Sequence, residues 1–524
     1  MHLAPVKRSV QITALWVSAA AVMLASGMLE HVMDDPYSIH EWRQRDALSQ
    51  TLRYMEPGRG FFEPAMHFQH ADDGRGAGEF TGFYYLNAHL WKVIGRPLPW
   101  TLRWTQAIAL LLGLLALGQA IRLWSNSRSA GAWAAWAVLV SPLIQFYGAN
   151  YLVNPSALMA VFAAWWMWAR SEGSEKGRVP WAVGAASMLL LAGLLRPTML
   201  LGGIPLAVRW WRCRDLRWPL ALGLGALVLA GVGAWVIWAK SYNAHHQSFY
   251  YLTTLRPIWD TPDWRVVWES LTAVRLQEVY HVHVRFLGGV VLVATWAFSR
   301  LKLQRGGSLF VLTGLGVVAY VLLWFKNLDV HDYYLLEVLM LVPLAVNWVA
   351  QSWPPGRVRL MGWVVLAAAA AYQAGHSVAR NRLKWGTTDG MLVEAFVPKW
   401  ERDEWAWYHA DRQNRLAPLA ALPEKLQEWG VPADAWVLSL PDQSPNISLT
   451  LMGRLGYTSL FENDKVAGSR VAWAAAHGAT FLVVNKPEIL KRGDWGPWLQ
   501  HEVGRMGDIV VYDLRQVPEG RLLP

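Results

Sequence analysis

The sequence predicts a polytopic α-helical membrane protein of about eleven spans, followed by a C-terminal soluble α/β domain. Three observations carry this prediction. The 524 residues are 54% hydrophobic and only 16% charged, whereas soluble domains carry roughly 25% charged residues. Apolar runs such as 220–238 approach the roughly 20 residues that cross a bilayer. The 34 Trp residues fit rings seated at membrane interfaces. These figures argue against a soluble enzyme and exclude a disordered or collagen-like chain.

The net charge of +10 also suits nucleic-acid binding. In a membrane protein it is typical of the basic bias of cytoplasmic loops, so no nucleic-acid partner is predicted. The only cysteine, Cys213, excludes an internal disulfide and a Cys-based metal site. His281 and His283 share an outside region with His245 and His246, but nothing fixes a coordination geometry. No cofactor is therefore predicted, and a divalent metal is without support.

The N-terminal segment predicts the first span. Lys7 and Arg8 precede an apolar stretch from about 10 to 29, which resembles a signal peptide. Because the apolar stretch is long for a cleaved signal, a signal-anchor is predicted, with cleavage as the alternative. This anchor places the N-terminus inside and the chain outside from Glu30 onward.

The remaining spans are predicted near 101–121, 131–148, 155–169, 180–195, 198–211, 218–239, 285–300, 308–325, 333–350 and 359–376. Arg196-Pro197 interrupts the stretch 180–211, since proline breaks a helix. Two short helices meeting at the outer face are therefore predicted there.

Basic residues in alternate connections support this register. They are Arg122 and Arg128; Arg170, Lys176 and Arg178; Arg209, Arg212, Arg214 and Arg217; Arg300, Lys302 and Arg305; and Arg357 and Arg359. The connection 149–154 on the other side carries none. This pattern predicts a transmembrane domain over 1–376, with external loops 30–100 and 240–284, and an external domain over 377–524.

The segment after residue 377 has a different composition, because charged residues return. Helices are predicted over 418–430, 446–454 and 465–478, and strands over 435–440, 480–485 and 508–513. Short apolar runs that alternate with helices are typical of a small α/β sheet. The segment is long enough to have its own core.

The first outside region is too long to be only a connector. It is predicted to contain a helix running to Tyr54 and an aromatic helix ending near Ile94-Gly95, both suited to the membrane interface. Glu41, Asp46 and Glu79 would then lie at the membrane surface, where a partly dehydrated carboxylate becomes a better base. An ordinary ion pair between Glu41 and Arg45, four residues apart, is the alternative.

The stretch Glu41-Trp42-Arg43-Gln44-Arg45-Asp46, followed by Gly78-Glu79-Phe80, resembles the first external loop of the GT-C glycosyltransferases. The most similar group is the bacterial relatives of protein O-mannosyltransferases and of the aminoarabinose transferase of lipid A. The similarity extends to the acidic loop after the first span, the span number and the C-terminal external domain. Shorter similarities lie at Leu195-Arg196-Pro197-Thr198, His331-Asp332-Tyr333-Tyr334 and Asp442-Gln443-Ser444-Pro445-Asn446.

The resemblance implies a GT-C-like fold and a function. A sugar would move, with inversion, from a polyprenyl-phosphate carrier to a hydroxyl of a glycan, lipid or protein acceptor. The reaction would take place on the outer face of a bacterial inner membrane. One carboxylate would act as base and a cation would hold the phosphate.

The family has an acidic Asp-Glu pair just after the first span, where this chain has His40-Glu41. The base is therefore left open between Glu41 and Asp46, with Glu79 supporting it or contacting the acceptor. Further candidates are Arg43, Arg196, Lys326 and His331 for the donor phosphate, and His40, Trp42, Asp332 and Tyr333 elsewhere in the site.

Two alternatives stay open at this point. The stretch Asp442–Asn446 follows a predicted strand, where α/β sheets bind ligands, but it also suits a plain helix N-cap. A flippase, or a ligase or polymerase that uses lipid-linked sugars, is the rival class of function. The long acidic first loop and the absence of a two-fold repeat in the spans argue against a transporter.

Overall fold

The computed structural model describes residues 5–70, 73–213, 216–249, 254–299, 305–354, 356–460, 468–491 and 495–516. The basic residues Arg214, Arg300 and Lys302 lie outside this part of the chain. The chain divides into two compact units. Unit 1 comprises Met1–Met33, Leu102–Val236 and Thr253–Arg402, and unit 2 comprises Asp34–Thr101, Ile237–Leu252 and Asp403–Pro524.

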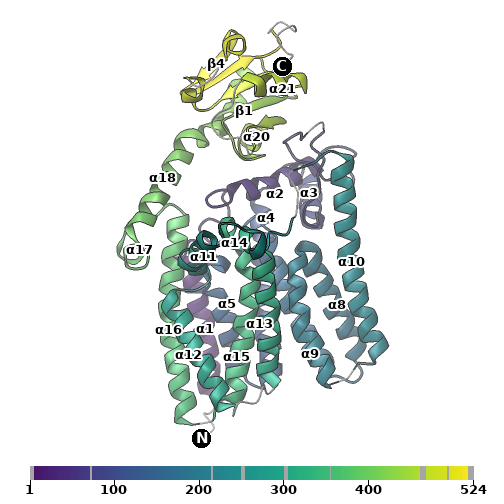
Figure 1. Ribbon diagram of the computed structural model, residues 1–524, viewed down its shortest axis with the longest axis vertical. Helices are drawn as coiled ribbons and strands as arrows, with labels where there is room; N and C mark the ends of the chain where they lie inside the picture. The colour runs from purple at the N-terminus through teal and green to yellow at the C-terminus, as the bar shows by residue number, and fades with distance from the viewer. Residues whose placement is uncertain are drawn as a thin grey trace. The chain divides into compact units, whose positions relative to one another are not determined.

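In the described part of unit 1, all regular secondary structure is helical (Figure 1). Its helices are α1 (Pro5–Ala25), α4 (Trp100–Ser125), α5 (Arg128–Leu139), α6 (Pro142–Tyr147), α7 (Asn154–Glu172), α8 (Arg178–Leu195), η1 (Pro197–Gly202), α9 (Gly203–Cys213), α10 (Trp218–His245), η2 (Ile258–Asp260), α11 (Trp264–Ala273), η3 (Arg275–Glu278), α12 (Val282–Phe298), α13 (Arg305–Leu323), α14 (Phe325–Val330), η4 (Asp332–Met340), α15 (Leu341–Ser352), α16 (Arg357–Lys384) and α17 (Met391–Phe396). Helix α10 continues into unit 2. Helix α7 packs against α8, and α13 packs against α15 and α9.

Five helical stretches are long and apolar enough to cross a membrane, among the described residues. They are Trp100–Ser125, Arg178–Leu195, Trp218–His245, Gly306–Leu323 and Asp332–Ser352. A sixth is the pair Trp264–Glu278 and Val282–Phe298, if its 89° bend belongs to one broken span. The described part of the first predicted span is the shorter apolar helix Trp16–Ala25, and the remaining predicted spans do not meet this test among the described residues. The count of eleven therefore stays a prediction.

The predicted break at Arg196-Pro197 is confirmed. Helix α8 ends at Leu195, and Arg196 is extended, with φ −158° and ψ 106°. The 3₁₀ helix η1 then begins at Pro197, whose fixed φ suits the first helical position. The chain continues into α9, so two short helices replace one long one, as predicted.

Unit 2 joins the first outside region to the C-terminal segment. The first region supplies α2 (Glu41–Tyr54) and α3 (Gly82–Ile94), close to the two predicted helices. The C-terminal segment supplies α18 (Lys399–Arg415), η5 (Ala417–Ala421), α19 (Leu422–Glu428), β1 (Val437–Leu440), α20 (Ile447–Met452), β2 (Gly456–Thr458), α21 (Gly468–Ala476), β3 (Phe481–Val484), η6 (Pro487–Lys491), η7 (Gly496–Leu499), β4 (Glu502–Met506) and β5 (Ile509–Asp513). The predicted domain boundary near residue 376 lies inside α16.

The strands form one mixed sheet in the order β2-β1-β3-β5-β4. Figure 1 labels β1 and β4 of this sheet. Strand β1 runs parallel to β2 and β3, and β5 runs antiparallel to β3 and β4. The core strands β1, β3 and β5 are buried along their whole length, which explains their continuous apolar sequences. The three predicted strands are confirmed, whereas the short strands β2 and β4 and helix α18 were missed.

The first outside region also contributes to this sheet. Phe68 forms a parallel bridge to Gly456 of β2, and the Gln69 N–H donates to the Gly456 carbonyl at 2.9 Å. Gly456 has φ +148°, and a Cβ there would lie 1.8 Å from the Val437 carbonyl oxygen, so only glycine fits. The Phe68 ring lies in the same buried core as the strands. The loop and the C-terminal segment therefore share one core.

His67 precedes Phe68 and is 8% exposed, with Nδ1 2.8 Å from the Ser49 hydroxyl. Burial, with a smaller effect of the Arg53 charge, lowers the pKa of His67 to about 3. Burial also lowers the pKa of His70 to about 4. Both imidazoles are therefore neutral in the folded protein at neutral pH.

We expect unit 2 to lose stability as the pH falls below 6.5. The folded pKa lies below the unfolded value, so the unfolded chain takes up the proton first and protonation favours unfolding. The penalty per histidine reaches about 2 kcal/mol at pH 5 and is absent above about pH 7. Thermal unfolding in detergent, followed between pH 7.5 and 5, measures it. His67→Gln should flatten the dependence, and an unchanged slope would contradict this origin.

Candidate functional site

The start of α2 positions the acidic candidates of unit 2. The preceding residue His40 is left-handed, with φ 54° and ψ 34°. The Gln44 side-chain amide donates to the carbonyls of Tyr37 (2.7 Å) and Ile39 (3.1 Å) and so fixes this turn. Trp42 follows, half-buried. The helix therefore presents four charged side chains within its first two turns: Glu41, Arg43, Arg45 and Asp46.

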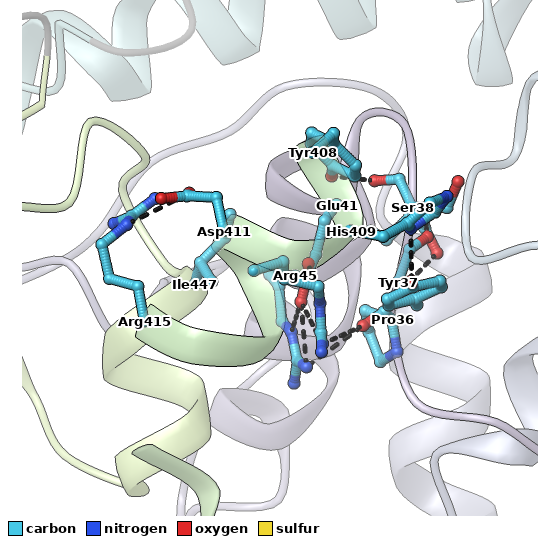
Figure 2. A network of polar contacts seen from close by, with 12 residues as sticks. Pro36, Tyr37, Ser38, Glu41, Arg45, Tyr408, His409, Asp411, Arg415 and Ile447 are labelled. Atoms are coloured by element: carbon cyan, nitrogen blue, oxygen red, sulfur yellow. Dashed lines mark hydrogen bonds and ion pairs between the residues drawn. The ribbon is translucent and has the colours of Figure 1, made fainter. Parts of the chain in front are cut away.

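Glu41 is enclosed by two arginines (Figure 2). It is 3% exposed. Arg45 donates to Oε1 from Nε at 3.3 Å and from Nη2 at 3.2 Å. Arg412 of α18 donates from Nε to Oε2 at 2.8 Å and from Nη2 to Oε1 at 3.0 Å. Both carboxylate oxygens are therefore engaged, and the predicted pair with Arg45 is present.

Further contacts bind α18 to the segment before α2 (Figure 2). The Tyr408 hydroxyl donates to the Ser38 carbonyl at 2.7 Å, and His409 contacts the Tyr37 hydroxyl. The Arg412 guanidinium lies 4.6 Å from the centre of the Tyr37 ring. Burial alone would lower the pKa of Arg412, but the hydrogen bond and charge of Glu41 outweigh it and raise that pKa. The Glu41 carboxylate thus connects the start of α2 to α18 within unit 2.

Asp46 and Glu79 are bridged by Arg43. Arg43 donates from Nη1 to Asp46 Oδ2 at 3.1 Å. It also donates from Nη2 to both oxygens of Glu79, at 3.1 and 2.8 Å. The Tyr84 hydroxyl donates to Glu79 Oε1 at 2.8 Å. The Asp46 side chain is 2% exposed, whereas those of Arg43 and Glu79 are each 19% exposed. A substrate can therefore reach Arg43 and Glu79 more easily than Asp46.

The charge state of Glu79 follows from these contacts. Burial would raise the pKa of its carboxyl, but the Arg43 charge and the Tyr84 hydrogen bond outweigh burial and lower that pKa. Glu79 is therefore ionised at neutral pH and can accept a hydroxyl hydrogen bond, but its lowered pKa makes it a weaker base than the partly dehydrated carboxylate expected from the sequence. Such a carboxylate beside an arginine suits a reaction that transfers a proton while charge shifts onto a phosphate.

Asn446 links this cluster to the C-terminal segment. Its Nδ2 donates to Asp46 Oδ1 at 2.8 Å, and its Oδ1 accepts from the Phe68 N–H at 3.0 Å. The neighbouring Asp442 accepts from the Ser444 and Ser448 N–H groups, each at 2.8 Å. The stretch Asp442–Asn446 thus caps α20, and its Asn446 orients Asp46.

Arg196, a candidate for the donor phosphate, makes a buried ion pair in unit 1. It is 7% exposed and donates from Nε to Glu337 Oε1 at 2.5 Å. Its Nη2 donates to the Tyr320 hydroxyl at 3.1 Å, and its guanidinium lies 4.5 Å from the Tyr334 ring centre. These contacts give Arg196 a partner that the sequence did not indicate.

The candidates of the 326–333 stretch lie in different surroundings of unit 1. Lys326 Nζ donates to Asp263 at 2.6 Å and is 31% exposed. The rings of His331 and Tyr333 are tilted to each other, with their centres 5.3 Å apart. Asp332 is fully buried and accepts from the Tyr147 hydroxyl at 2.5 Å.

Asp332 belongs to a larger buried network. Lys384 Nζ lies 3.7 Å from Asp332 Oδ2 and donates to Glu278 at 2.6 Å. Arg380 bonds the same Glu278 and also Glu401, at 2.7 and 3.0 Å. Asp332 is therefore a poor choice of base, because proton uptake by its carboxylate would disturb several ion pairs of this network.

The histidines near His281 contact one another and neighbouring aromatic rings. The rings of His281 and His283 lie 4.8 Å apart, and His281 also contacts His376 and Tyr372. Within the described ranges, no group of three or more His, Cys, Asp or Glu side chains is placed to hold a metal ion.

The sequence did not indicate several partners of the candidates. Arg412, Tyr84 and Lys384 each contact a candidate carboxylate, yet Arg412 is 371 residues away from Glu41. No local pattern marks Arg412 or Lys384, because long-range pairs follow from the tertiary fold, and Tyr84 lies only five residues from Glu79. Among these partners, Asn446 alone was marked by the sequence, because it belongs to the stretch Asp442–Asn446 that follows a predicted strand.

We expect Glu41→Gln and Arg412→Gln to destabilise unit 2 rather than to remove the base. Each change breaks charge-assisted hydrogen bonds that contribute about 1.5–3 kcal/mol. Because both changes break the same contact, the double variant should be little worse than either single one. Thermal unfolding and limited proteolysis at α18 measure this. Full stability with lost activity in Glu41→Gln alone would instead assign Glu41 as the base.

No protein-family model matches the chain, and no curated protein matches it in sequence. Solved structures do. The oligosaccharyltransferase of Archaeoglobus fulgidus has 12% identity and a TM-score of 0.54, over 90% of this chain and 69% of that one. Its complex with an inhibitory peptide and a dolichol-phosphate has 11% identity and a TM-score of 0.51, over 91% of this chain and 69% of that one.

The mycobacterial arabinofuranosyltransferase AftD has 15% identity and a TM-score of 0.52, over 96% of this chain and 40% of that one. This chain thus spans less than half the length of AftD. Both neighbours are membrane glycosyltransferases of the GT-C fold. At these identities the likeness establishes the fold, and the apolar helices agree with it. The protein is therefore a multi-pass membrane protein with the GT-C fold.

Proposed function

We propose that the protein is a glycosyltransferase that moves a sugar from a polyprenyl-phosphate carrier to an acceptor hydroxyl. One observation carries the proposal: Arg43 bridges the carboxylates of Asp46 and Glu79 in the first loop of a GT-C fold. The fold neighbour solved with a dolichol-phosphate supports a lipid-phosphate donor. The fold alone does not define the reaction, so the argument depends on these side chains.

In the proposed reaction the acceptor oxygen attacks the anomeric carbon, and the bond from that carbon to the phosphate oxygen breaks. The electron pair leaves with the polyprenyl phosphate, and the hydroxyl proton passes to a carboxylate. A single displacement inverts the anomeric centre. Glu79 is the more accessible base and Asp46 the more buried one, while Arg43 stabilises the charge that develops on the phosphate.

The proposal places the N-terminus in the cytoplasm and the C-terminal domain outside a bacterial inner membrane. The alternating basic connections support this orientation. A C-terminal alkaline phosphatase fusion should be active and a C-terminal fluorescent-protein fusion dark. The opposite pattern would overturn the orientation.

Donor cleavage tests the function directly. Purified protein in lipid nanodiscs, given a radiolabelled polyprenyl-phosphate sugar and an envelope extract as acceptor, should release free polyprenyl phosphate and label the acceptor. Use of only a pyrophosphate-linked donor would indicate a ligase or polymerase. Movement of the intact lipid across the bilayer without cleavage would indicate a flippase. Either result would overturn the proposal.

A further inference from the structure

Three neighbouring cavities of unit 2 lie at one end of the strands of the C-terminal sheet. The first, of about 430 Å³, is lined by Trp429, Glu502 and Arg515 among others. The second, of about 350 Å³, shares Arg515 with the first and adds Trp436. The third, of about 460 Å³, shares Trp436 with the second and reaches Arg53 of α2. Adjacent cavities share lining residues and therefore lie next to one another; the three together are here called the edge groove. Each volume lies within the roughly 300–1,000 Å³ of ligand sites.

Two indole rings in the edge groove are held in place by glycines. A Cβ at Gly504 would lie 2.3 Å from the Trp429 ring, and a Cβ at Gly478 would lie 3.2 Å from the Trp436 ring. The ring of each Trp therefore packs directly on a backbone that has no side chain. Both tryptophans also line the groove, so each offers a fixed aromatic surface to a ligand.

The polar groups of the groove are of the kind that binds hydroxyls. Arg515 and Asp513 form a two-point ion pair, with distances of 2.9 and 2.8 Å, and Arg515 lies over the Phe481 ring. The amide of Gln500 lines the same cavity. In the third cavity, Arg53 is 7% exposed and its Nε has no hydrogen-bond partner among the described residues. A ligand hydroxyl would satisfy that donor.

The charged residues that line the edge groove argue against a polyanionic ligand. Two arginines line the groove together with four carboxylates, which are Glu56, Asp434, Glu502 and Asp513. Such a surface repels phosphate chains and nucleic acid. Its polar groups also make it unsuited to an acyl chain. Fixed aromatic faces, carboxylates and amides together fit a neutral saccharide, whose C–H faces stack on indoles and whose hydroxyls pair with polar groups.

We propose that the edge groove binds a neutral glycan chain, which is the acceptor of the transferase. That the bound glycan is the acceptor rests on the proposed function. That the groove binds a glycan rests on the groove alone. The third cavity includes Leu52 and Arg53 near the end of α2, and Asp46 lies seven residues earlier on that helix. That separation is about 10 Å along the helix axis. A chain in the groove would therefore lead from the sheet toward the Arg43 cluster.

Calorimetry on the full-length protein in detergent tests the groove. The probe is a pool of neutral oligosaccharides released from envelope polysaccharides of the native host, compared with a peptide pool of similar mass. Trp429→Ala and Trp436→Ala should each weaken oligosaccharide binding about tenfold, since a buried aromatic anchor dominates binding. Trp407→Ala is the matched control, because Trp407 is 68% exposed in the same unit and lines none of these cavities.

Exposed polar variants keep the test meaningful if a Trp variant fails to fold. Gln500→Ala and Asp434→Ala should weaken binding about threefold, the loss expected for one hydrogen bond. No oligosaccharide binding by the wild type, binding unchanged in all four groove variants, or preference for the peptides would overturn the inference.

Donor cleavage separates this inference from the proposed function. Groove variants should release polyprenyl phosphate normally with a small alcohol as acceptor, but should show a raised KM for the oligosaccharides. Saccharide binding without any donor cleavage would support glycan binding in the groove and contradict the proposed transferase function. Donor cleavage without saccharide binding would support the transferase function and contradict glycan binding in the groove.

Discussion

Asp46→Asn and Glu79→Gln are expected to slow sugar transfer by about 10²–10⁴-fold, the usual loss when a general base is removed. One of the two should show the full effect, and the other a smaller effect through Arg43. The neutral isosteres keep the hydrogen-bonding shape while removing the charge that Arg43 neutralises. Glu79 is the first choice, since its side chain is 19% exposed against 2% for Asp46.

Single-turnover kinetics with labelled donor measure this loss. Expression, thermal midpoint and donor binding should stay nearly unchanged, so that the change is in the chemical step. Glu63→Gln is the matched control, because Glu63 is a carboxylate of the same loop whose side chain is 42% exposed. If both site isosteres retain activity within a few-fold of wild type, neither Asp46 nor Glu79 is the base.

The carboxylates became candidates because the first outside loop is acidic and resembles the first external loop of the GT-C glycosyltransferases. Helices α2 and α3 lie close to the helix predicted to run to Tyr54 and the aromatic helix predicted to end near Ile94-Gly95. The buried strands β1, β3 and β5 were visible as short apolar runs. Strand β2 has only three residues, and β4 is half-exposed with a polar sequence, so neither has a recognisable pattern.

The pairings of the site were not predictable from the same patterns. Glu41 contacts Arg412 across 371 residues, and Asp46 contacts Asn446 across 400. Such contacts depend on the tertiary fold, which packs the first loop and the C-terminal segment around one core. The sequence treated that segment as a separate domain, because the helices of unit 1 lie between the two regions in the chain.

Arg196 illustrates the same limit within unit 1. The sequence marked it correctly as an arginine at a helix break, and a buried arginine is costly unless paired. Its partner Glu337 lies 141 residues away and is fully buried. The sequence made Arg196 a candidate for the donor phosphate because an arginine at such a membrane position is costly unless paired. In the structure its partner is the Glu337 carboxylate.

Arg196→Ala is expected to destabilise the protein by about 3–5 kcal/mol, because it leaves the carboxylate of Glu337 buried without its partner. Adding Glu337→Gln removes the uncompensated charge, so the double variant should recover much of the lost thermal stability. The recovered double variant then tests donor binding without the complication of misfolding. A donor KM raised tenfold or more in it would assign Arg196 to the phosphate, since a charge-assisted contact contributes about 1.5–3 kcal/mol. We expect an unchanged KM, because the guanidinium already donates to Glu337 and to the Tyr320 hydroxyl. Arg43, which is partly exposed beside Glu79, is the cation that we then propose for the phosphate.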